Sequence, residues 1–152
     1  RFWSSPRWTT VPLMLVPVDL RYSHDHQWIR VEGDVWRVGI TEFAQEALGE
    51  VTMVRIYGAS GGVIEHRCTP SPISAGDEMG EIEAFKAMTD LYMPVDAVVV
   101  EANAALDDSP TAVNNDPYGD GWLCTVRPNA ASDVGNLLDA QAYRELIGYT
   151  DD

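Results

Sequence analysis

Apolar and polar residues alternate along several short segments of this chain, and this alternation is typical of half-buried β-strands. The clearest case is residues 28–40, WIRVEGDVWRVGI, in which Ile29 and Val31 alternate with polar neighbours before a second alternating run. Gly33 and Asp34 separate the two runs and are residues that favour tight turns. The segment therefore predicts a β-hairpin.

Further strands are predicted over residues 51–57, 78–85 and 90–103, which show the same alternation. The last two are separated by only a few residues around Lys86. Such a short connection favours an antiparallel hairpin. Lys86 is therefore expected at a hairpin tip.

Two short helices are predicted by their end signals and by apolar residues three or four positions apart. Thr41 is a good N-terminal cap for the first helix, and Gly49 a good C-terminal stop. Asp139 and Gly148 play the same parts for a helix near the end of the chain. The expected apolar face of this last helix consists of Ala142, Tyr143, Leu146 and Ile147.

These elements predict a mainly β fold, a flattened barrel-sandwich hybrid with short helices that include a C-terminal one. At 152 residues the chain is expected to form one domain, over residues 21–152. Residues 58–75 are rich in Gly, Ser and Pro and are interpreted as a loop insertion in that domain.

Residues 1–20 are expected to form an N-terminal extension. Its first eighteen residues contain two arginines and no acidic residue, whereas the rest of the chain is strongly acidic. This contrast is compatible with the remnant of a mitochondrial transit peptide or with a tail of no consequence. The first interpretation places the protein in the mitochondrial matrix, and the second in a bacterial-type cytoplasm.

The composition excludes some classes of partner. The chain has 24 acidic and 10 basic residues, a formal net charge of -14, so it repels nucleic acid and anionic lipid and favours partners with basic faces. The apolar run at residues 11–18 contains two prolines and is much shorter than the roughly 20 residues of a membrane-spanning helix. Cys68 and Cys124 are expected to be free thiols.

Lys86 is the only lysine in the chain. At an exposed hairpin tip its amine is accessible to acylation by another enzyme, so Lys86 is a candidate attachment point. Glu83 and Asp90 lie three residues before and four after it. These acids favour the charged amine, which argues against a nucleophilic lysine. A solvated surface lysine is the plainer alternative.

Other motifs carry little chemistry. The histidines of the HDH triplet at 24–26, with His66 elsewhere, fall short of a zinc ligand set, so no metal is expected. No phosphate-loop, GxGxxG or HExxH motif occurs, and no catalytic residue is predicted. An autonomous enzyme is the weaker hypothesis.

Several of these segments, taken together, resemble the H-protein family of the glycine cleavage system. The resemblance begins near Tyr22 and extends to the C-terminus. It is carried by YSHDHQW (22–28), VGITEFAQEALGEV (38–51), GEIEAFKAMTDLYMPV (80–95), NAALDDSPTAVNNDPYGDGWL (103–123) and LLDAQAYRELI (137–147).

The resemblance implies that lipoate is joined by an amide to Lys86, with Glu83 and Asp90 contributing to recognition for lipoylation. The chain is then a non-catalytic carrier that takes an aminomethyl group from a pyridoxal-phosphate glycine decarboxylase to a tetrahydrofolate-dependent aminomethyltransferase. Dihydrolipoamide dehydrogenase reoxidises the arm, and a lipoyl-attaching enzyme installs it. The implied partners include neither nucleic acid nor membrane.

Four alternatives stay open at this point. The chain could be a lipoyl carrier or relay protein for another pathway, or a biotinyl carrier, although the methionines that usually flank a biotinyl lysine are missing beside Lys86. It could be a small enzyme that uses Lys86 or the HDH triplet, or a purely structural interaction module. Lys86 favours the carrier, because an interaction module leaves the single lysine unexplained.

Overall fold

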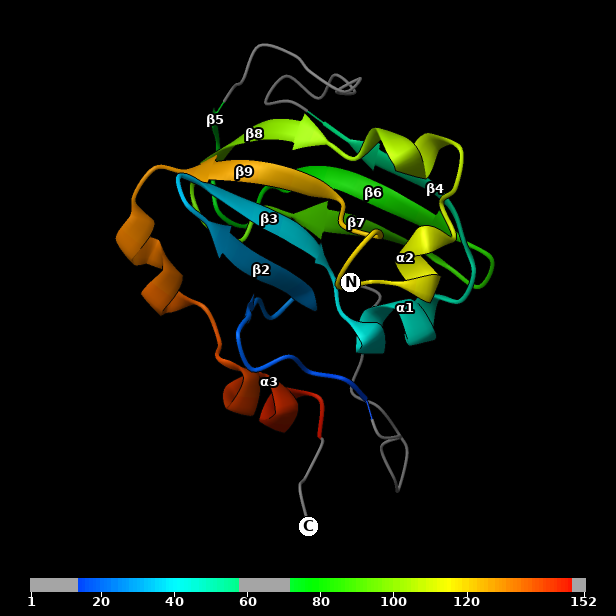
Figure 1. Cartoon of the computed structure of the whole chain (residues 1–152), viewed down its shortest axis with the longest axis horizontal. Coiled ribbons are helices and arrows are strands. Elements are labelled where there is room, and N and C mark those ends of the chain that lie inside the picture. The colour runs from blue at the N-terminus through cyan, green and yellow to red at the C-terminus, as the bar shows by residue number, and fades with distance from the viewer. Residues whose placement is uncertain (1–13, 58–71, 149–152) are drawn as a thin grey trace.

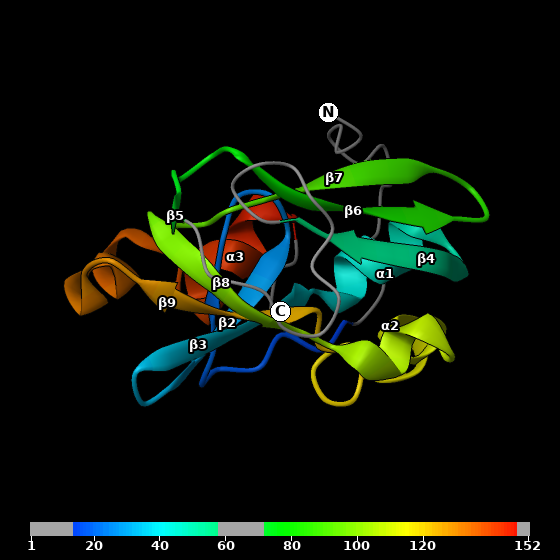
Figure 2. The same cartoon turned by 90° about the horizontal axis from the view of Figure 1, so that it is seen from above.

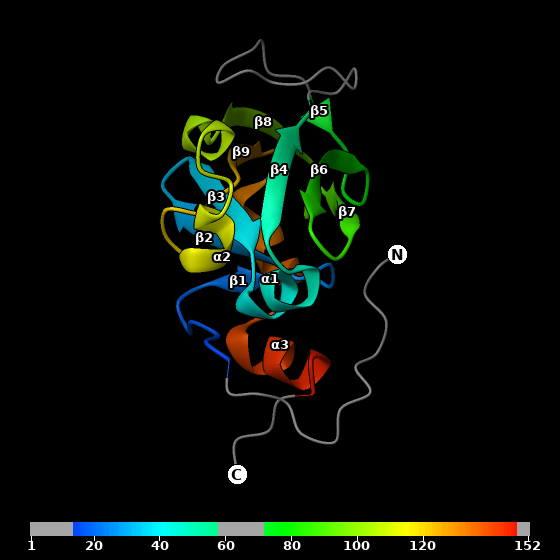
Figure 3. The same cartoon turned by 90° about the vertical axis from the view of Figure 1, so that its right-hand side faces the viewer.

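The computed structural model describes residues 14–57 and 72–148, and its architecture is mainly β. The strands form two antiparallel sheets that face each other, as Figure 1 and the end-on view of Figure 3 show. The first sheet has the order β1-β2-β3-β9-β8-β5, with β1 Arg21–Tyr22, β2 Gln27–Glu32, β3 Val35–Ile40, β9 Cys124–Pro128, β8 Ala97–Ala102 and β5 Pro72–Ile73. The second has the order β4-β6-β7, with β4 Val51–Ile56, β6 Glu78–Ala84 and β7 Met88–Tyr92. The predicted fold class is confirmed.

Short helices close the two sheets at their ends. Helices α1 Glu42–Leu48 and α2 Ala112–Asn115 lie together at one end, seen from above in Figure 2, and α3 Ala140–Leu146 packs below the first sheet. The described residues also include two 3-10 helices, Ala104–Asp107 and Ala131–Asn136. In the part of the chain that the structure describes, no helix is both long and apolar enough to cross a membrane.

The predicted hairpin over residues 28–40 is confirmed as β2 and β3, joined through Gly33, whose φ is 67°. One detail of its alternation is wrong, because Val31 is exposed while Trp28 and Ile29 are both buried. Trp28 lies on the outer face of the first sheet, where α3 and the loop before β9 cover it. Both faces of β2 are therefore covered at this point, and simple alternation does not hold.

The strand predicted over residues 90–103 is two strands, β7 and β8, which belong to different sheets. The break falls at residues 93–96 and contains Pro94, which has no N–H to donate to a sheet. Met93 and Val95 are buried within this break and continue the core between the two sheets. Their apolar character made the segment resemble one continuous strand.

Both predicted helices form with the expected caps. Thr41 accepts a hydrogen bond from the Ala44 N–H at the start of α1, and Asp139 accepts one from the Ala142 N–H at the start of α3. The predicted apolar face of α3 is partly wrong: Leu146 is exposed, and Ala140 is buried in its place beside Tyr143. In so short a helix, the positions of the apolar residues alone do not predict which side chains are buried.

Two apolar clusters hold these layers together. The larger lies between the sheets and includes Trp36, Ile82 and Leu91, and the smaller joins α3 to the outer face of the first sheet through Tyr22, Trp28 and other residues. In the smaller cluster the Tyr22 and Tyr143 rings stack with centroids 4.6 Å apart. Met14, Val16 and Leu20, all from the predicted N-terminal extension, are buried there too. The described part of that extension therefore packs on the domain.

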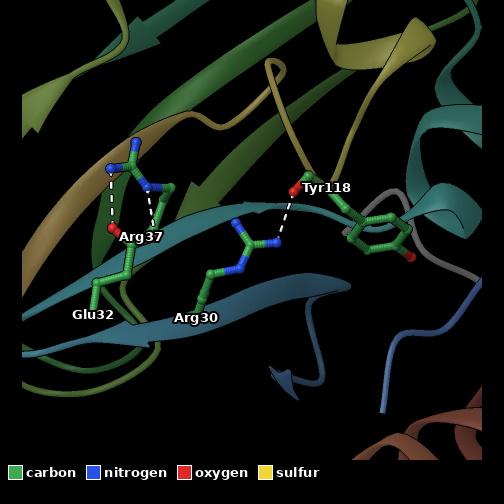
Figure 4. A network of polar contacts seen from close by, with 4 residues as sticks. All are labelled: Arg30, Glu32, Arg37 and Tyr118. Atoms are coloured by element: carbon green, nitrogen blue, oxygen red, sulfur yellow. Dashed lines mark hydrogen bonds and ion pairs between the residues drawn. The ribbon is translucent and has the colours of Figure 1, made fainter. Parts of the chain in front are cut away.

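The loop before β9 is anchored on the β2–β3 hairpin by polar contacts (Figure 4). Arg30 donates to the Tyr118 carbonyl at 2.8 Å, and the Trp28 indole N–H donates to the Pro117 carbonyl at 2.8 Å. Next to them, Arg37 forms a two-bond ion pair with Glu32 at 2.9 and 3.0 Å. The arginines of this hairpin are thus engaged in structural contacts.

The predicted loop insertion at 58–75 mostly lies outside the described residues. At its end, Pro72 and Ile73 form β5, which pairs with Val98 and Ala97 of β8. This short edge strand was not expected, because a proline and a neighbouring serine indicate a loop. The division into an extension over 1–20 and a domain over 21–152 remains a prediction.

Candidate functional site

Lys86 lies at the tip of the β6–β7 hairpin, as the sequence predicts. Strand β6 ends at Ala84 and β7 begins at Met88, and the Ala84 N–H donates to the Ala87 carbonyl at 2.8 Å. This hairpin extends toward the end of the molecule that carries α1 and α2 (Figures 1 and 2). The Lys86 side chain is exposed.

The hairpin tip is fixed to the end of α1 by main-chain hydrogen bonds. The Phe85 N–H donates to the Glu50 carbonyl at 2.8 Å, and the Lys86 N–H donates to the Leu48 carbonyl at 3.3 Å. The last carbonyls of a helix have no partner within the helix, so an incoming hairpin can use them. The lysine is therefore exposed while its backbone is held in place.

Asn114 of α2 supports the segment that receives the hairpin. Its side-chain N–H group donates to the Gly49 carbonyl at 2.7 Å and to Gln45 Oε1 at 3.0 Å, and its Oδ1 accepts from the Val51 N–H at 2.8 Å. One amide thus joins the end of α1 to the start of β4. Sequence reasoning missed Asn114, because nothing local to residue 114 signals these distant partners.

Gly49 lies directly under the Lys86 side chain. Its φ of 83° and ψ of -160° belong to a region that only glycine occupies readily. A β-carbon at this position would also lie 3.1 Å from Cγ and 3.2 Å from Cδ of Lys86. Gly49 therefore ends α1, as predicted, and also makes room for the lysine stem.

Glu83 and Asp90 lie on the outer face of the hairpin that presents Lys86. Glu83 pairs with Met88 in the register, and Asp90 pairs with Glu81, whereas the alternate residues Ile82 and Leu91 point into the core. The two acids are diagonal neighbours on adjacent strands. Both are partly exposed, and neither takes part in the ion pairs found among the described residues.

A depression of about 410 Å³ opens beside the lysine. It is lined by Lys86 together with Gln45, Glu46, Gly49, Glu50, Thr111, Asn114 and Asn115. Polar groups dominate this lining, and Glu46 and Glu50 are exposed acids. The base of Lys86 is thus bordered by a polar, negatively charged surface.

The two described histidines of the HDH triplet do not line the depression beside Lys86. His24 is exposed, whereas His26 is buried, and His66 lies outside the described residues. His26 Nδ1 is 2.8 Å from the Tyr143 hydroxyl, and that hydroxyl is 2.7 Å from Thr41 Oγ1. Burial, with a smaller effect of His24, lowers the pKa of His26 to about 4. His26 is thus part of a structural network.

Residues 14–57 and 72–148 contain no group of three His, Cys, Asp or Glu side chains placed to hold a metal ion. Cys124 is free and fully buried in the core, and burial raises the pKa of its thiol to about 12. Such a thiol is a poor nucleophile at neutral pH. Cys68 lies outside the described residues.

Fold and site together define a class of protein, a small β domain that presents one accessible lysine on a rigid hairpin. The glycine cleavage H-protein family model matches residues 20–149. The glycine cleavage system H protein of Bacteroides fragilis is 44% identical over 134 residues, which are 88% of this chain and 98% of that protein. That of Bacillus subtilis is 39% identical over 133 residues, 88% and 97% of the two chains.

A solved structure gives the same result. The crystal structure of a glycine cleavage system H protein from Mycobacterium marinum superposes with a TM-score of 0.73 at 37% identity, covering 88% of this chain and 99% of that one. The chain belongs to the glycine cleavage H-protein family. Its role is that of a non-catalytic lipoyl carrier of the glycine cleavage system, which confirms the resemblance found in the sequence.

Proposed function

We propose that lipoate is attached to this chain by an amide bond to the amine of Lys86, and that Lys86 is the residue through which the chain acts as a carrier. The observation that supports this most strongly is the exposed Lys86 on a hairpin tip whose backbone is bonded to Glu50 and Leu48. Because the chain has no other lysine, no second amine of this kind competes for the modification.

The residues around Lys86 fit such an attachment. The amine needs access to the attaching enzyme, and the exposed tip provides it. The base of the arm needs a fixed starting point, and the contacts of the tip with the end of α1 provide that. When bound, lipoate supplies a dithiolane that undergoes reduction and carries groups, so the hard chemistry belongs to the cofactor and the partner enzymes.

Glu83 and Asp90 are proposed as recognition residues for the lipoyl-attaching enzyme. They lie on one outer face of the same hairpin, one on each strand, and both are partly exposed. Carboxylates in this position can pair with basic groups of an enzyme that approaches the lysine. Among the described residues neither carboxylate forms an ion pair, and the attraction of Glu83 to the nearby Arg55 is a minor one.

The proposed partners act on the arm in turn. They are a pyridoxal-phosphate glycine decarboxylase, a tetrahydrofolate-dependent aminomethyltransferase and dihydrolipoamide dehydrogenase. Each has to bind and release the carrier, and the net charge of -14 favours fast electrostatic encounter with basic surfaces. The tether raises the local concentration of the arm once the carrier has docked.

The cellular location remains a prediction from the N-terminal residues. The relatives described above are bacterial proteins and give no support to a mitochondrial location. A bacterial-type cytoplasm and the mitochondrial matrix are both compatible with the carrier role.

Reconstitution tests the carrier role. The lipoylated chain is incubated with purified glycine decarboxylase, glycine and pyridoxal phosphate, and carbon dioxide release is measured against carrier concentration. We expect saturable stimulation by the wild-type chain and none by Lys86→Arg. A fully lipoylated chain that does not stimulate release would favour a carrier or relay protein for another pathway.

A further inference from the structure

Two large apolar side chains are exposed on either side of Lys86. Phe85 is 82% exposed, and Met88 is 56% exposed. In the described part of the chain only four other large apolar residues are exposed to a comparable degree, namely Leu15, Val18, Val31 and Leu146. Single exposed apolar residues are common on proteins, but a phenylalanine with most of its surface in water directly beside the functional lysine is a candidate contact residue.

The exposure of Phe85 is enforced by the fold. Its N–H is bonded to the Glu50 carbonyl, while Ala84 and Ala87 on either side of the tip face the core. Met88 stands opposite Glu83 at the first pair of the ladder, on the outer face of the hairpin. The backbone of the hairpin tip is already fixed. Binding of a partner that covers these side chains therefore causes only a small loss of conformational entropy in the tip.

We infer that Phe85 and Met88 form a docking pair for the enzyme that acylates Lys86. This inference rests on the proposed function of Lys86. The occupant is an enzyme with an apolar recess for the phenyl ring and a basic rim. Complementary charge on the carrier comes from Glu46 and Glu50, which border the depression beside Lys86, and from Glu83 on the outer face.

The position of the reacting atom indicates that the occupant is the acylating enzyme and not one of the other proposed partners. In acylation the lysine amine attacks the acyl carbon of a lipoyl-adenylate made from lipoate and ATP. A C–N amide bond forms, the bond from the acyl carbon to the phosphate oxygen breaks, AMP leaves, and the amine proton passes to a base of the enzyme. This enzyme must bring its active site up to Nζ of Lys86, and it therefore contacts the neighbouring side chains. Enzymes that act on the dithiolane work at the far end of the completed arm.

The test is the initial rate of lipoylation of the unmodified full-length chain by a purified lipoate ligase with lipoate and magnesium ATP, followed by intact mass over a range of carrier concentrations. For Phe85→Ala we expect kcat/KM to fall about tenfold, mainly through a higher KM. Met88→Ala should show a smaller loss in the same direction. Phe85→Tyr, which keeps the ring, should stay close to the wild type.

Val31→Ala is the matched control, because Val31 is also exposed, at 52%, but lies on the β2–β3 hairpin. It should be lipoylated at the wild-type rate. Once lipoylated, the arm of Phe85→Ala should be reduced by dihydrolipoamide dehydrogenase with NADH, the reverse of the reoxidation step, at the wild-type rate.

Two results would overturn the docking pair: equal kcat/KM for the wild type and a Phe85→Ala/Met88→Ala double variant, or a Phe85→Ala defect confined to the dehydrogenase step. A wild-type chain that the ligase leaves unmodified, under conditions that lipoylate a control carrier, would instead contradict the proposed function of Lys86.

Discussion

The side-chain carbons of Lys86 lie against the α-carbon of Gly49, so closely that a methyl group there would meet Cγ of Lys86 at 3.1 Å. The lysine stem thus rests on the residue that ends α1. This contact makes the orientation of Lys86 depend on the absence of a side chain at position 49.

Gly49→Ala should therefore have two effects. It should destabilise the protein by about 1–3 kcal/mol, because alanine is strained at this backbone conformation. It should also push the lysine stem away and change the rate at which a ligase modifies Lys86. Urea denaturation and the lipoylation rate measure the two effects separately.

Gly76→Ala is the matched control for that substitution. Gly76 also has a positive φ, 84°, but a β-carbon there would have no neighbour within 4 Å. It should lose stability without a change in lipoylation by the folded protein. Equal lipoylation rates for folded Gly49→Ala and Gly76→Ala would show that the contact with Lys86 has no functional consequence.

Asn114 is expected to stabilise the support beneath the lysine. Asn114→Ala leaves the Gly49 carbonyl and the Val51 N–H without their partner, at a cost of about 1–3 kcal/mol in the free energy of unfolding. Asn115→Ala is the control, because Asn115 is exposed and lines the same depression. If the two variants unfold at the same urea concentration, the Asn114 bonds are not stabilising.

His26 should make stability depend on pH. Its pKa is lowered from 6.5 to about 4, so between these pH values the unfolded chain binds a proton at His26 that the folded chain does not. Stability should therefore fall as the pH drops through this window, by roughly 3 kcal/mol from this residue.

The comparison with His26→Gln isolates this contribution. The free energy of unfolding, measured by urea denaturation from pH 7 to pH 4, should fall less steeply for His26→Gln than for the wild type. His24→Gln, which changes an exposed histidine, should keep most of the wild-type slope. Identical slopes for the wild type and His26→Gln would refute the assignment.

Tyr143→Phe should destabilise the attachment of α3. The hydroxyl of Tyr143 is shared by His26 and Thr41 in a buried position, so its removal leaves both groups without that partner. We expect a loss of about 1–3 kcal/mol. Urea denaturation measures this loss, and an unchanged free energy of unfolding in Tyr143→Phe would contradict the structural role of the hydroxyl.

Those features of the fold that depend on neighbouring residues could be predicted from the sequence. The β2–β3 hairpin, the caps Thr41 and Asp139, and the position of Lys86 at a tip all follow from local alternation and turn chemistry. The split between β7 and β8 was missed because the buried Met93 and Val95 continue the apolar pattern through the break.

The support of the site could not be predicted in the same way. Asn114 and Gly49 are 65 positions apart, and their contact exists only after α1, α2 and the hairpin have come together. The sequence around Lys86 identified the lysine as a candidate attachment point, and the folded structure shows which residues hold its hairpin in place. Phe85 and Met88 likewise become candidate contact residues only because their side chains are exposed in the folded chain.

The most direct test of the central claim is the intact mass of the purified chain after incubation with a lipoate ligase, lipoate and ATP, followed by peptide mapping. The account predicts one lipoyl increment per chain, located on the peptide that contains Lys86, and none on Lys86→Arg. An unmodified chain under conditions that fully lipoylate a control carrier, or a lipoyl group that persists in Lys86→Arg, would contradict it.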